Sequence, residues 1–210
     1  MQKNNWEIVY SNFQEDENYV ATAYYTDSLL DIGWDKLAIT TNSMFNDELQ
    51  AEAAGRLEGE LTKDRIYYHH LNLKDDYVID DNISEFFEKH ESFVFNSVKK
   101  KKKNDPMIYN AYLIKIQYNA IMEQYNSVVD PTRQLTKNDF HQLNYIAEIP
   151  DLIDKFRVEK TGETDYSKMT EKELFNNFLQ RTHCFALFKI KNDLSELYFG
   201  HNTWNNTYYP

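Results

Sequence analysis

The sequence predicts an α+β fold, in which antiparallel strands pack against helices. Segments rich in β-branched and aromatic residues, which favour strands, occur near both ends of the chain. Between them, apolar residues recur at helical spacing in several long segments. The 210 residues include only 5 glycines and 4 prolines, which argues against long loop-rich stretches. Because neither an internal repeat nor a clear linker is evident, we expect a single domain over residues 1–210.

The first part of the chain is expected to be β structure. Residues 6–10 and 19–25 carry mostly β-branched and aromatic side chains, and a polar segment at residues 14–18 connects them. A further strand is expected over residues 34–41, where Leu37 and Ile39 alternate with polar neighbours.

A helix is expected over residues 48–70, with Asn46 or Asp47 capping its first N–H groups. Small residues recur every four positions on one face of this helix, and they include Gly55 and Gly59. Each glycine inside a helix costs roughly 1 kcal/mol relative to alanine. Two glycines on one face therefore indicate that a sheet or another helix packs very close there.

Further helices are expected at residues 82–98, 106–125, 140–149, 151–156 and 170–180. Thr170 and Glu173 have the spacing of a capping box at the start of the last of these helices. The polar segment 158–168 is expected to be a surface loop. The five lysines at 99–103 are interpreted as a solvated link between two helices, and a localisation signal or a patch for anionic lipid is the alternative.

Composition excludes several classes of protein. The formal net charge of -11 disfavours a nucleic-acid partner, which would need a basic surface. No apolar stretch approaches the roughly 18–20 residues of a transmembrane helix, and the first residues lack the apolar core of a signal peptide. The histidines form no zinc-binding pattern, so neither a metal nor another cofactor is expected. Asn82 and Asn205 begin glycosylation sequons, which function only in the secretory pathway.

Cys184 is the only cysteine, so it cannot form an internal disulfide or a multi-thiolate metal site. It is either a small buried apolar residue or a nucleophile. Residues 184–190 and 195–201 both alternate, which predicts an antiparallel hairpin. Pairing positions whose numbers sum to 385 places Cys184 opposite His201, with Cβ atoms about 4.5–5.5 Å apart. An imidazole at that distance favours the thiolate.

The same register predicts the partners on both faces of the hairpin. Lys189 would pair with Glu196 on one face, and the other face would be mostly apolar. A slip of one residue would destroy both features.

The segment Gly200, His201, Asn202, Thr203 and Trp204, after a strand led by a cysteine, resembles the phospholipase B-like proteins, a branch of the N-terminal-nucleophile hydrolases. A second block resembles the front motif of that family. Its residues are Gly33, Trp34, Leu37, Ile39, Thr41, Asn42, Asp47, Gln50, Ala51, Ala53, Ala54, Gly55, Glu58, Gly59, Leu61 and Thr62. The two blocks occur in the family's order and bracket most of the chain.

The resemblance implies a precursor that cleaves its own peptide bond between His183 and Cys184. The cysteine then becomes a chain start whose α-amino group, with a pKa of about 7.7–8, serves as the base for its thiol. Residues 1–183 would be a propeptide-like fragment that stays associated with the catalytic fragment starting at residue 184. His201 is implied as the catalytic histidine and Trp204 as a wall of the substrate pocket.

The implied fold is the αββα sandwich of N-terminal-nucleophile hydrolases, and the implied activity is hydrolysis of acyl ester or amide bonds in lipids. The implied location is lysosomal or secreted. Family members continue well beyond the histidine motif, so the chain is interpreted as the front part of a member, either truncated or degenerate. The alternative function is an inactive family member that binds lipids or other partners.

Overall fold

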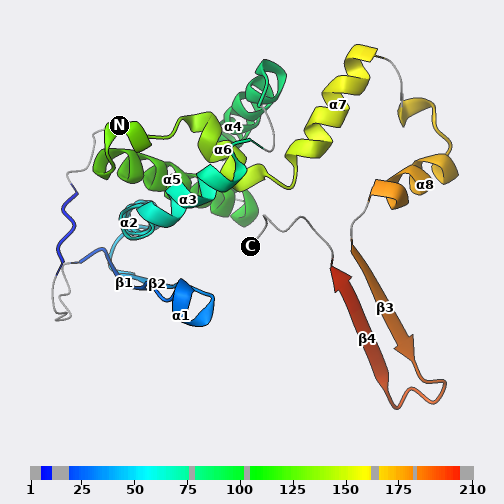
Figure 1. The fold of residues 1–210 in the computed structure, drawn as a ribbon, viewed down its shortest axis with the longest axis horizontal. Coiled ribbons are helices and arrows are strands. Elements are labelled where there is room, and N and C mark those ends of the chain that lie inside the picture. The colour runs from blue at the N-terminus through cyan, green and yellow to red at the C-terminus, as the bar shows by residue number, and fades with distance from the viewer. Residues whose placement is uncertain are drawn as a thin grey trace. The chain divides into compact units, whose positions relative to one another are not determined.

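The computed structural model describes residues 6–10, 19–75, 79–101, 105–161, 166–181 and 184–203 (Figure 1). The α+β class is confirmed, because helices occupy the middle of the chain and two small antiparallel sheets lie toward its ends. The chain divides into two compact units, Met1–Ile149 and Pro150–Pro210. Each unit is described by itself, and the single domain over residues 1–210 stays a prediction.

The first unit contains a two-stranded antiparallel sheet, in which β1 (Ala21–Thr26) pairs with β2 (Lys36–Thr41). Leu37 and Ile39 on β2 are partly buried, whereas their neighbours in the strand are exposed, as the alternation predicts. The strand expected over residues 6–10 is absent from this described segment. Side chains tether it instead, since Trp6 Nε1 donates to Glu52 at 2.7 Å and Tyr10 Oη donates to Glu60 at 2.9 Å.

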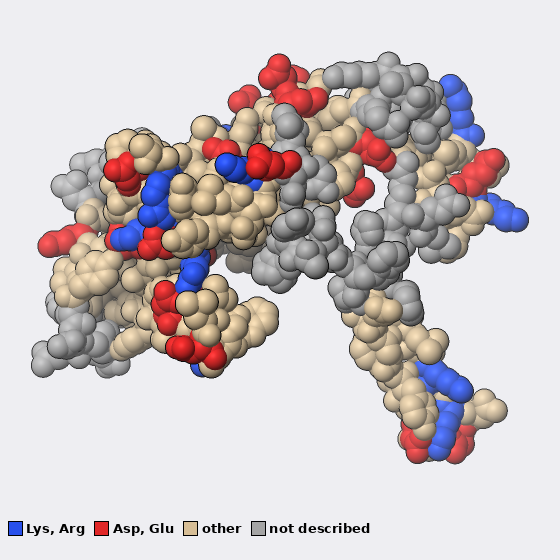
Figure 2. Space-filling model, viewed as in Figure 1, with Lys and Arg blue, Asp and Glu red and all other residues tan. Residues whose placement is uncertain are grey.

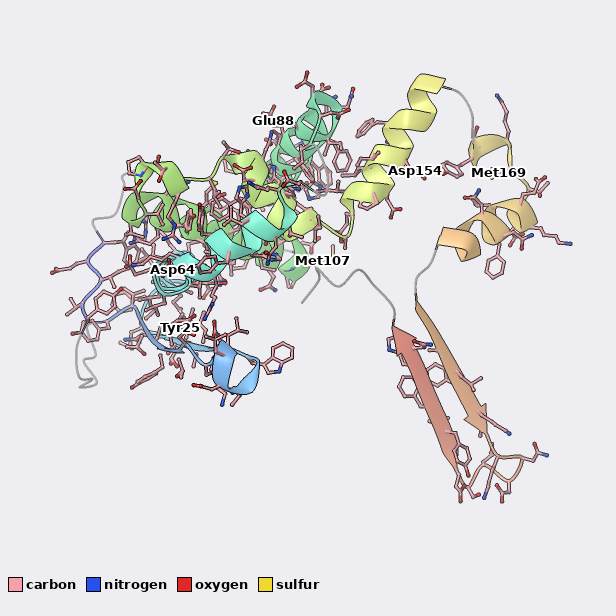
Figure 3. The ribbon with its side chains drawn as sticks, in the orientation of Figure 1. Tyr25, Asp64, Glu88, Met107, Asp154 and Met169 are labelled. Carbon is pink, nitrogen blue, oxygen red and sulfur yellow. The ribbon has the colours of Figure 1, made fainter. Side chains whose placement is uncertain are left out.

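A short helix, α1 (Leu29–Ile32), connects the two strands and ends at Gly33, whose φ of 81° lies in the left-handed region that favours glycine. Asp35 fixes this connection. One carboxylate oxygen accepts hydrogen bonds from the backbone N–H groups of Ser28 and Leu29, both at 2.9 Å. The other oxygen accepts from the Tyr25 hydroxyl at 2.9 Å (Tyr25 is labelled in Figure 3). The connection is therefore held by side-chain bonds as well as by the β ladder.

The long helix expected over residues 48–70 is two helices, α2 (Asp47–Leu61) and α3 (Lys63–Leu73). Asn46 is the N-cap, and its side chain accepts from the N–H of Leu49 at 2.9 Å. The break falls at Thr62, whose φ of -104° and ψ of 11° are not helical. Its hydroxyl donates to the Glu58 carbonyl at 2.7 Å, a local bond that competes with helix continuation.

The two glycines of α2 lie against α5 (Pro106–Val128), which confirms the predicted close approach. A methyl group built at Gly55 would lie 2.2 Å from the carbonyl oxygen of Gln117. At Gly59 it would lie 2.6 Å from the carbonyl oxygen of Ile121. Only glycine permits helix backbones this close, so these residues set the distance between α2 and α5.

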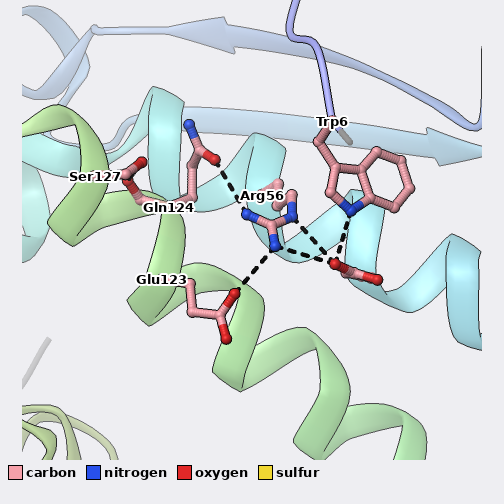
Figure 4. Close-up of polar contacts among 6 residues, drawn as sticks. Trp6, Arg56, Glu123, Gln124 and Ser127 are labelled. Carbon is pink, nitrogen blue, oxygen red and sulfur yellow. Dashed lines mark hydrogen bonds and ion pairs between the residues drawn. The ribbon is translucent and has the colours of Figure 1, made fainter. Parts of the chain in front are cut away.

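A polar network beside the glycines joins the start of the chain to α2 and α5 (Figure 4). Arg56 on α2 bonds Glu52 and Glu123, both at 3.0 Å, and Glu52 also accepts from the Trp6 indole. The Arg56 guanidinium lies 6.0 Å from the centre of the Trp6 ring. These contacts stabilise residues 6–10 against α2 without strand pairing.

Helices α4 (Asp81–Lys101) and α6 (Lys137–Tyr145) also belong to the first unit, as does a short 3-10 helix (Pro131–Arg133). Asp80 accepts a hydrogen bond from the N–H of Ile83 at 3.0 Å and so caps α4, which begins one residue earlier than expected. Thr136 and Asp139 form a capping box at the start of α6. The fully buried ring of Tyr125 packs with Leu135 and Phe140 in the core. Residues 99–101 of the lysine run belong to α4, and residues 102–103 lie outside the described residues.

The second unit contains α7 (Ile149–Thr161), a short 3-10 helix (Tyr166–Lys168), α8 (Glu171–Arg181) and the hairpin of β3 (Cys184–Ile190) with β4 (Leu197–Thr203). The capping box of Thr170 and Glu173 at the start of α8 is confirmed. The loop expected from residue 158 is wrong in its first part, because α7 extends to Thr161. Within the described residues, no helix is both long enough and apolar enough to cross a membrane.

Candidate functional site

The hairpin that carries Cys184 and His201 is present, but its register differs from the predicted one by two residues. Paired positions sum to 387, so Cys184 lies opposite Thr203 and His201 lies opposite Ala186. The prediction that Cys184 and His201 are direct cross-strand partners is therefore wrong. The two residues occupy diagonal positions instead, and such positions are about 7–8 Å apart.

The turn explains the shift. The Lys191 N–H donates to the Glu196 carbonyl at 3.1 Å, so the turn is centred one residue later than predicted. Leu194 has a φ of 57°, and its N–H donates to the Lys191 carbonyl at 2.9 Å. The Asp193 carboxylate accepts from the N–H of Ser195 at 3.1 Å and from its hydroxyl at 2.7 Å. Bonds inside the turn therefore decide the register.

The predicted ion pair also moves with the register. Glu196 pairs with Lys191 at 3.0 Å and accepts a short hydrogen bond from the Tyr198 hydroxyl. Lys189, the predicted partner of Glu196, lies opposite Tyr198. Figure 2 shows the charged side chains of the hairpin gathered toward its turn. The other end of the hairpin, residues 184–188 and 197–203, carries Cys184 and His201 and contains no lysine, arginine, aspartate or glutamate.

A shift of two residues keeps the same positions on each face. Phe188 and Phe199 are directly opposite, with ring centres 5.0 Å apart, and His201 follows on the same face. Every side chain described between Ala186 and Asn202 is exposed, and the side chains project from both faces of the hairpin (Figure 3). Phe188 is 65% exposed. The described hairpin thus presents His201 on an open strand beside aromatic side chains.

The remaining predicted site residues lie outside the described residues. These are His183, on the carbonyl side of the predicted cleavage bond, and Trp204, the predicted pocket wall. For Cys184 the structure gives the backbone position at the start of β3. In the part of the chain that is described, no group of histidine, cysteine and acidic side chains has the arrangement of a metal site.

The front block that resembles the family has structural roles in the first unit. Gly33 ends α1, Leu37 and Ile39 face inward from β2, and Gly55 and Gly59 lie against α5. Another residue of the block, Thr41, donates its hydroxyl hydrogen to Gln50 at 2.8 Å, which links the end of β2 to α2.

A second cluster of titratable groups was not predicted. Glu91 on α4 bonds Lys115 on α5, and it also bonds Lys137 and His141 on α6 at 2.6 Å and 3.1 Å. Burial alone would raise the pKa of Glu91, but its hydrogen bonds to these basic groups lower that pKa to about 2. Burial lowers the pKa of Lys115 and of His141. The four residues of this cluster are far apart in sequence, so no local pattern connects them. The one feature visible in the sequence is that His141 follows the apolar Phe140 early in a capped helix.

Comparison with known proteins resolves the family. The family model for Phospholipase B matches residues 21–209, which include both blocks, Cys184 and His201. The chain belongs to the phospholipase B family. It is 34% identical over 209 residues to Phospholipase B-like protein C of Dictyostelium discoideum, covering 96% of this chain and 35% of that protein.

Other members of the phospholipase B family are similar over the same length. Phospholipase B-like protein B of Dictyostelium discoideum is 32% identical over 197 residues, covering 91% of this chain and 34% of that protein. Phospholipase B of Crotalus adamanteus is 28% identical over 200 residues, covering 90% of this chain and 35% of that protein. The chain therefore spans about a third of the length of these curated relatives. The resemblance stated from the two sequence blocks is confirmed.

Proposed function

We propose that this chain supplies the nucleophile of a lipid hydrolase, with Cys184 as the attacking residue. The observation that carries the proposal is the Phospholipase B match over residues 21–209, which includes Cys184 and the histidine motif. Relatives named phospholipase B support a phospholipid or a related acyl compound as substrate. The chain spans about a third of the length of those relatives, so the complete substrate pocket is proposed here and not described.

The first step is cleavage of the peptide bond between His183 and Cys184. The Cys184 thiol attacks the carbonyl carbon of His183, the C–N bond breaks, and the nitrogen takes a proton to become the free α-amino group. Water then hydrolyses the thioester, which leaves a carboxylate on His183 and restores the thiol. Residues 1–183 and the fragment from Cys184 are proposed to stay associated.

Turnover repeats this chemistry on a lipid. The α-amino group, with an ordinary pKa of about 7.7–8, accepts the thiol proton near neutral pH. The thiolate attacks the acyl carbonyl, the alcohol or amine leaves with a proton, and water releases the fatty acid. His201 is proposed as the second catalytic group and Trp204 as a wall for the substrate. The diagonal placement of Cys184 and His201 suits a contact through substrate or water better than a direct hydrogen bond.

The proposed location is lysosomal or secreted, with Asn82 and Asn205 as glycosylation sites. Asn82 is partly buried in the first turn of α4, and its side-chain amide donates to Asp80 at 3.0 Å, a bond that a glycan would replace. Asn205 lies outside the described residues. A deglycosylation shift in the mass of protein secreted from eukaryotic cells tests this assignment. An unchanged mass would contradict it.

Mass spectrometry of the purified chain at neutral and acidic pH tests the cleavage. We expect a fragment whose sequence begins at Cys184, and we expect no such fragment from Cys184→Ala. Lys189→Ala is the matched control, because it changes an exposed residue of the same strand and leaves the nucleophile in place. An intact bond between His183 and Cys184 under all conditions would count against self-cleavage.

The rate of thiol alkylation separates the hydrolase from the alternative, an inactive family member that binds lipids or other partners. A hydrolase thiol reacts faster at neutral pH than a free cysteine, because more of it is thiolate. A reaction no faster than that of a free thiol, together with unchanged phospholipid, would favour the binding protein.

A further inference from the structure

Glu91 and His141 hold three helices of the first unit together. The Glu91 carboxylate extends from α4 and bonds Lys115 on α5 and Lys137 on α6, in addition to the Nε2 of His141 at 3.1 Å. His141 is only 2% exposed. One carboxylate therefore connects α4 to both neighbouring helices, and a buried imidazole is one of its partners.

The hydrogen bond to Glu91 identifies a ring nitrogen of His141 that carries a hydrogen. An ionised carboxylate only accepts hydrogen bonds, so Nε2 carries the hydrogen that lies between His141 and Glu91. The other ring nitrogen, Nδ1, is buried and has no hydrogen-bond partner. A neutral ring leaves Nδ1 as an unprotonated acceptor, whereas a protonated ring would make it a buried N–H donor. The closed arrangement of the helices therefore favours neutral His141.

The surroundings of His141 oppose a second proton. Its ring packs among Phe87, Tyr118 and Tyr145, with ring centres 4.7, 6.3 and 5.9 Å away. The buried Tyr118 hydroxyl has no hydrogen-bond partner, so it does not serve as an acceptor for Nδ1.

The charged groups that face the ring are Glu91 from α4, Lys115 from α5 and Lys137 from α6. The titratable phenols are Tyr118 and Tyr145, and burial raises the pKa of both. Protonation would place a third positive charge around one carboxylate.

We propose that Glu91 and His141 form an acid-sensitive lock, which holds α6 against α4 and α5 near neutral pH and releases it as the pH falls below about 6.5. The two states differ in whether the His141 ring is enclosed among the three helices or reaches solvent. Burial and the two lysines lower the pKa of His141 in the closed state. An exposed histidine has an ordinary pKa of about 6.5, so acid favours the open state.

Proton linkage gives the direction and the size of the pH effect on the opening equilibrium of α6. The open state binds one more proton than the closed state between the ordinary pKa and the lowered one. Over that range the opening equilibrium rises at most tenfold for each unit that the pH falls. Glu91 stays ionised until about pH 2, so it does not contribute to the change near pH 6.

Hydrogen exchange of the intact chain tests the lock. Exchange of residues 137–145, corrected for the intrinsic pH dependence, gives the opening constant of α6. In the native sequence we expect it to rise by roughly fivefold between about pH 6.5 and pH 5.5, because an open-state histidine is already half protonated at about pH 6.5. His141→Phe keeps an aromatic ring and should remove the dependence on pH. His90→Phe is the matched control, since His90 lies exposed on α4 and its replacement should leave the slope unchanged.

The outcomes decide the proposal in either direction. A flat opening constant in the native sequence, or an unchanged slope in His141→Phe, would overturn it. A direct titration of the His141 imidazole by NMR in the native chain avoids the risk that the variant does not fold. Protonation of His141 at or above about pH 6.5 without faster exchange of α6 would also overturn the lock.

Discussion

Replacing Gly55 with alanine should destabilise the first unit, although alanine is the better helix former. The added methyl carbon would lie 2.2 Å from the Gln117 carbonyl oxygen, 3.0 Å from the Gln117 carbonyl carbon and 2.8 Å from the Ala120 methyl. Two of these atoms belong to the backbone of α5, so a side-chain rotation cannot relieve the clash. To relieve the overlap, α5 must move away from α2 by roughly 1 Å. This movement would loosen the close packing between the two helices.

The magnitude follows from two opposing effects. Overpacking in a close-packed core costs about 1–3 kcal/mol, and a clash with backbone lies at the upper end of that range. The gain in helix propensity is about 1 kcal/mol. We therefore expect Gly55→Ala to lower the free energy of unfolding by about 2 kcal/mol. Gly59→Ala should cost less, because its closest contact is longer, at 2.6 Å.

Urea unfolding followed by far-ultraviolet circular dichroism measures the effect. With a slope of about 2 kcal/mol per molar urea, the midpoint of Gly55→Ala should fall by about 1 M. Ala51→Gly is the matched control on the same face, and it should cost about 1 kcal/mol from helix propensity alone. Gly55→Ala and Ala51→Gly are opposite substitutions one helical turn apart, and both should therefore be destabilising.

The double variant adds a sharper test. Once Gly55→Ala has separated α2 from α5, a methyl at Gly59 meets less resistance, so the two losses should sum to less than their separate values. A Gly55→Ala variant that is as stable as the native chain, or more stable, would refute the close contact between α2 and α5.

Three further predictions concern local features of the first unit. Gly33→Ala should cost about 1 kcal/mol, because the φ of 81° strains an alanine, whereas Gly33→Asn should cost less in the same thermal unfolding experiment. Thr136→Ala removes the capping box with Asp139 and should lower the free energy of α6 unfolding by about 1 kcal/mol, and an unchanged urea midpoint would contradict this. Burial alone would raise the pKa of Glu60, but hydrogen bonds from Lys63 and other donors lower it, so its contribution to stability should be lost as the pH falls below about 4.5. A Glu60 carboxyl that titrates by NMR at or above 4.5 would contradict that assignment.

Local signals in the sequence predicted most of the helical segments and some of their caps. Asn46 and Thr170 each precede a helix, and each satisfies first-turn N–H groups through a side chain or a capping box. Such signals depend on residues within one turn of each other, so they can be read without a tertiary fold. The glycines of α2 likewise predicted a close neighbour, although not that the neighbour is α5.

The candidate site was predicted less completely, and the hairpin shows why. The predicted register and the observed one both place Phe188 and Phe199 on one face, because a face depends only on whether positions are odd or even. Registers that differ by two residues share the same faces, so the pattern cannot distinguish them. The bonds of Asp193 and the left-handed Leu194 in the turn made the choice, and they moved His201 from Cys184 to Ala186.

The sequence by itself determined the α+β class, some of the helix caps, the two faces of the hairpin and membership of the phospholipase B family. Each of these rests on neighbouring residues or on motifs that lie within a short span. Only the tertiary structure decided which helix lies against the α2 glycines, the tether of Trp6 to α2 and the meeting of Glu91 with His141. The partners in these contacts are brought together by helix packing, and a sequence pattern with a period of a few residues carries no record of which helix faces become neighbours.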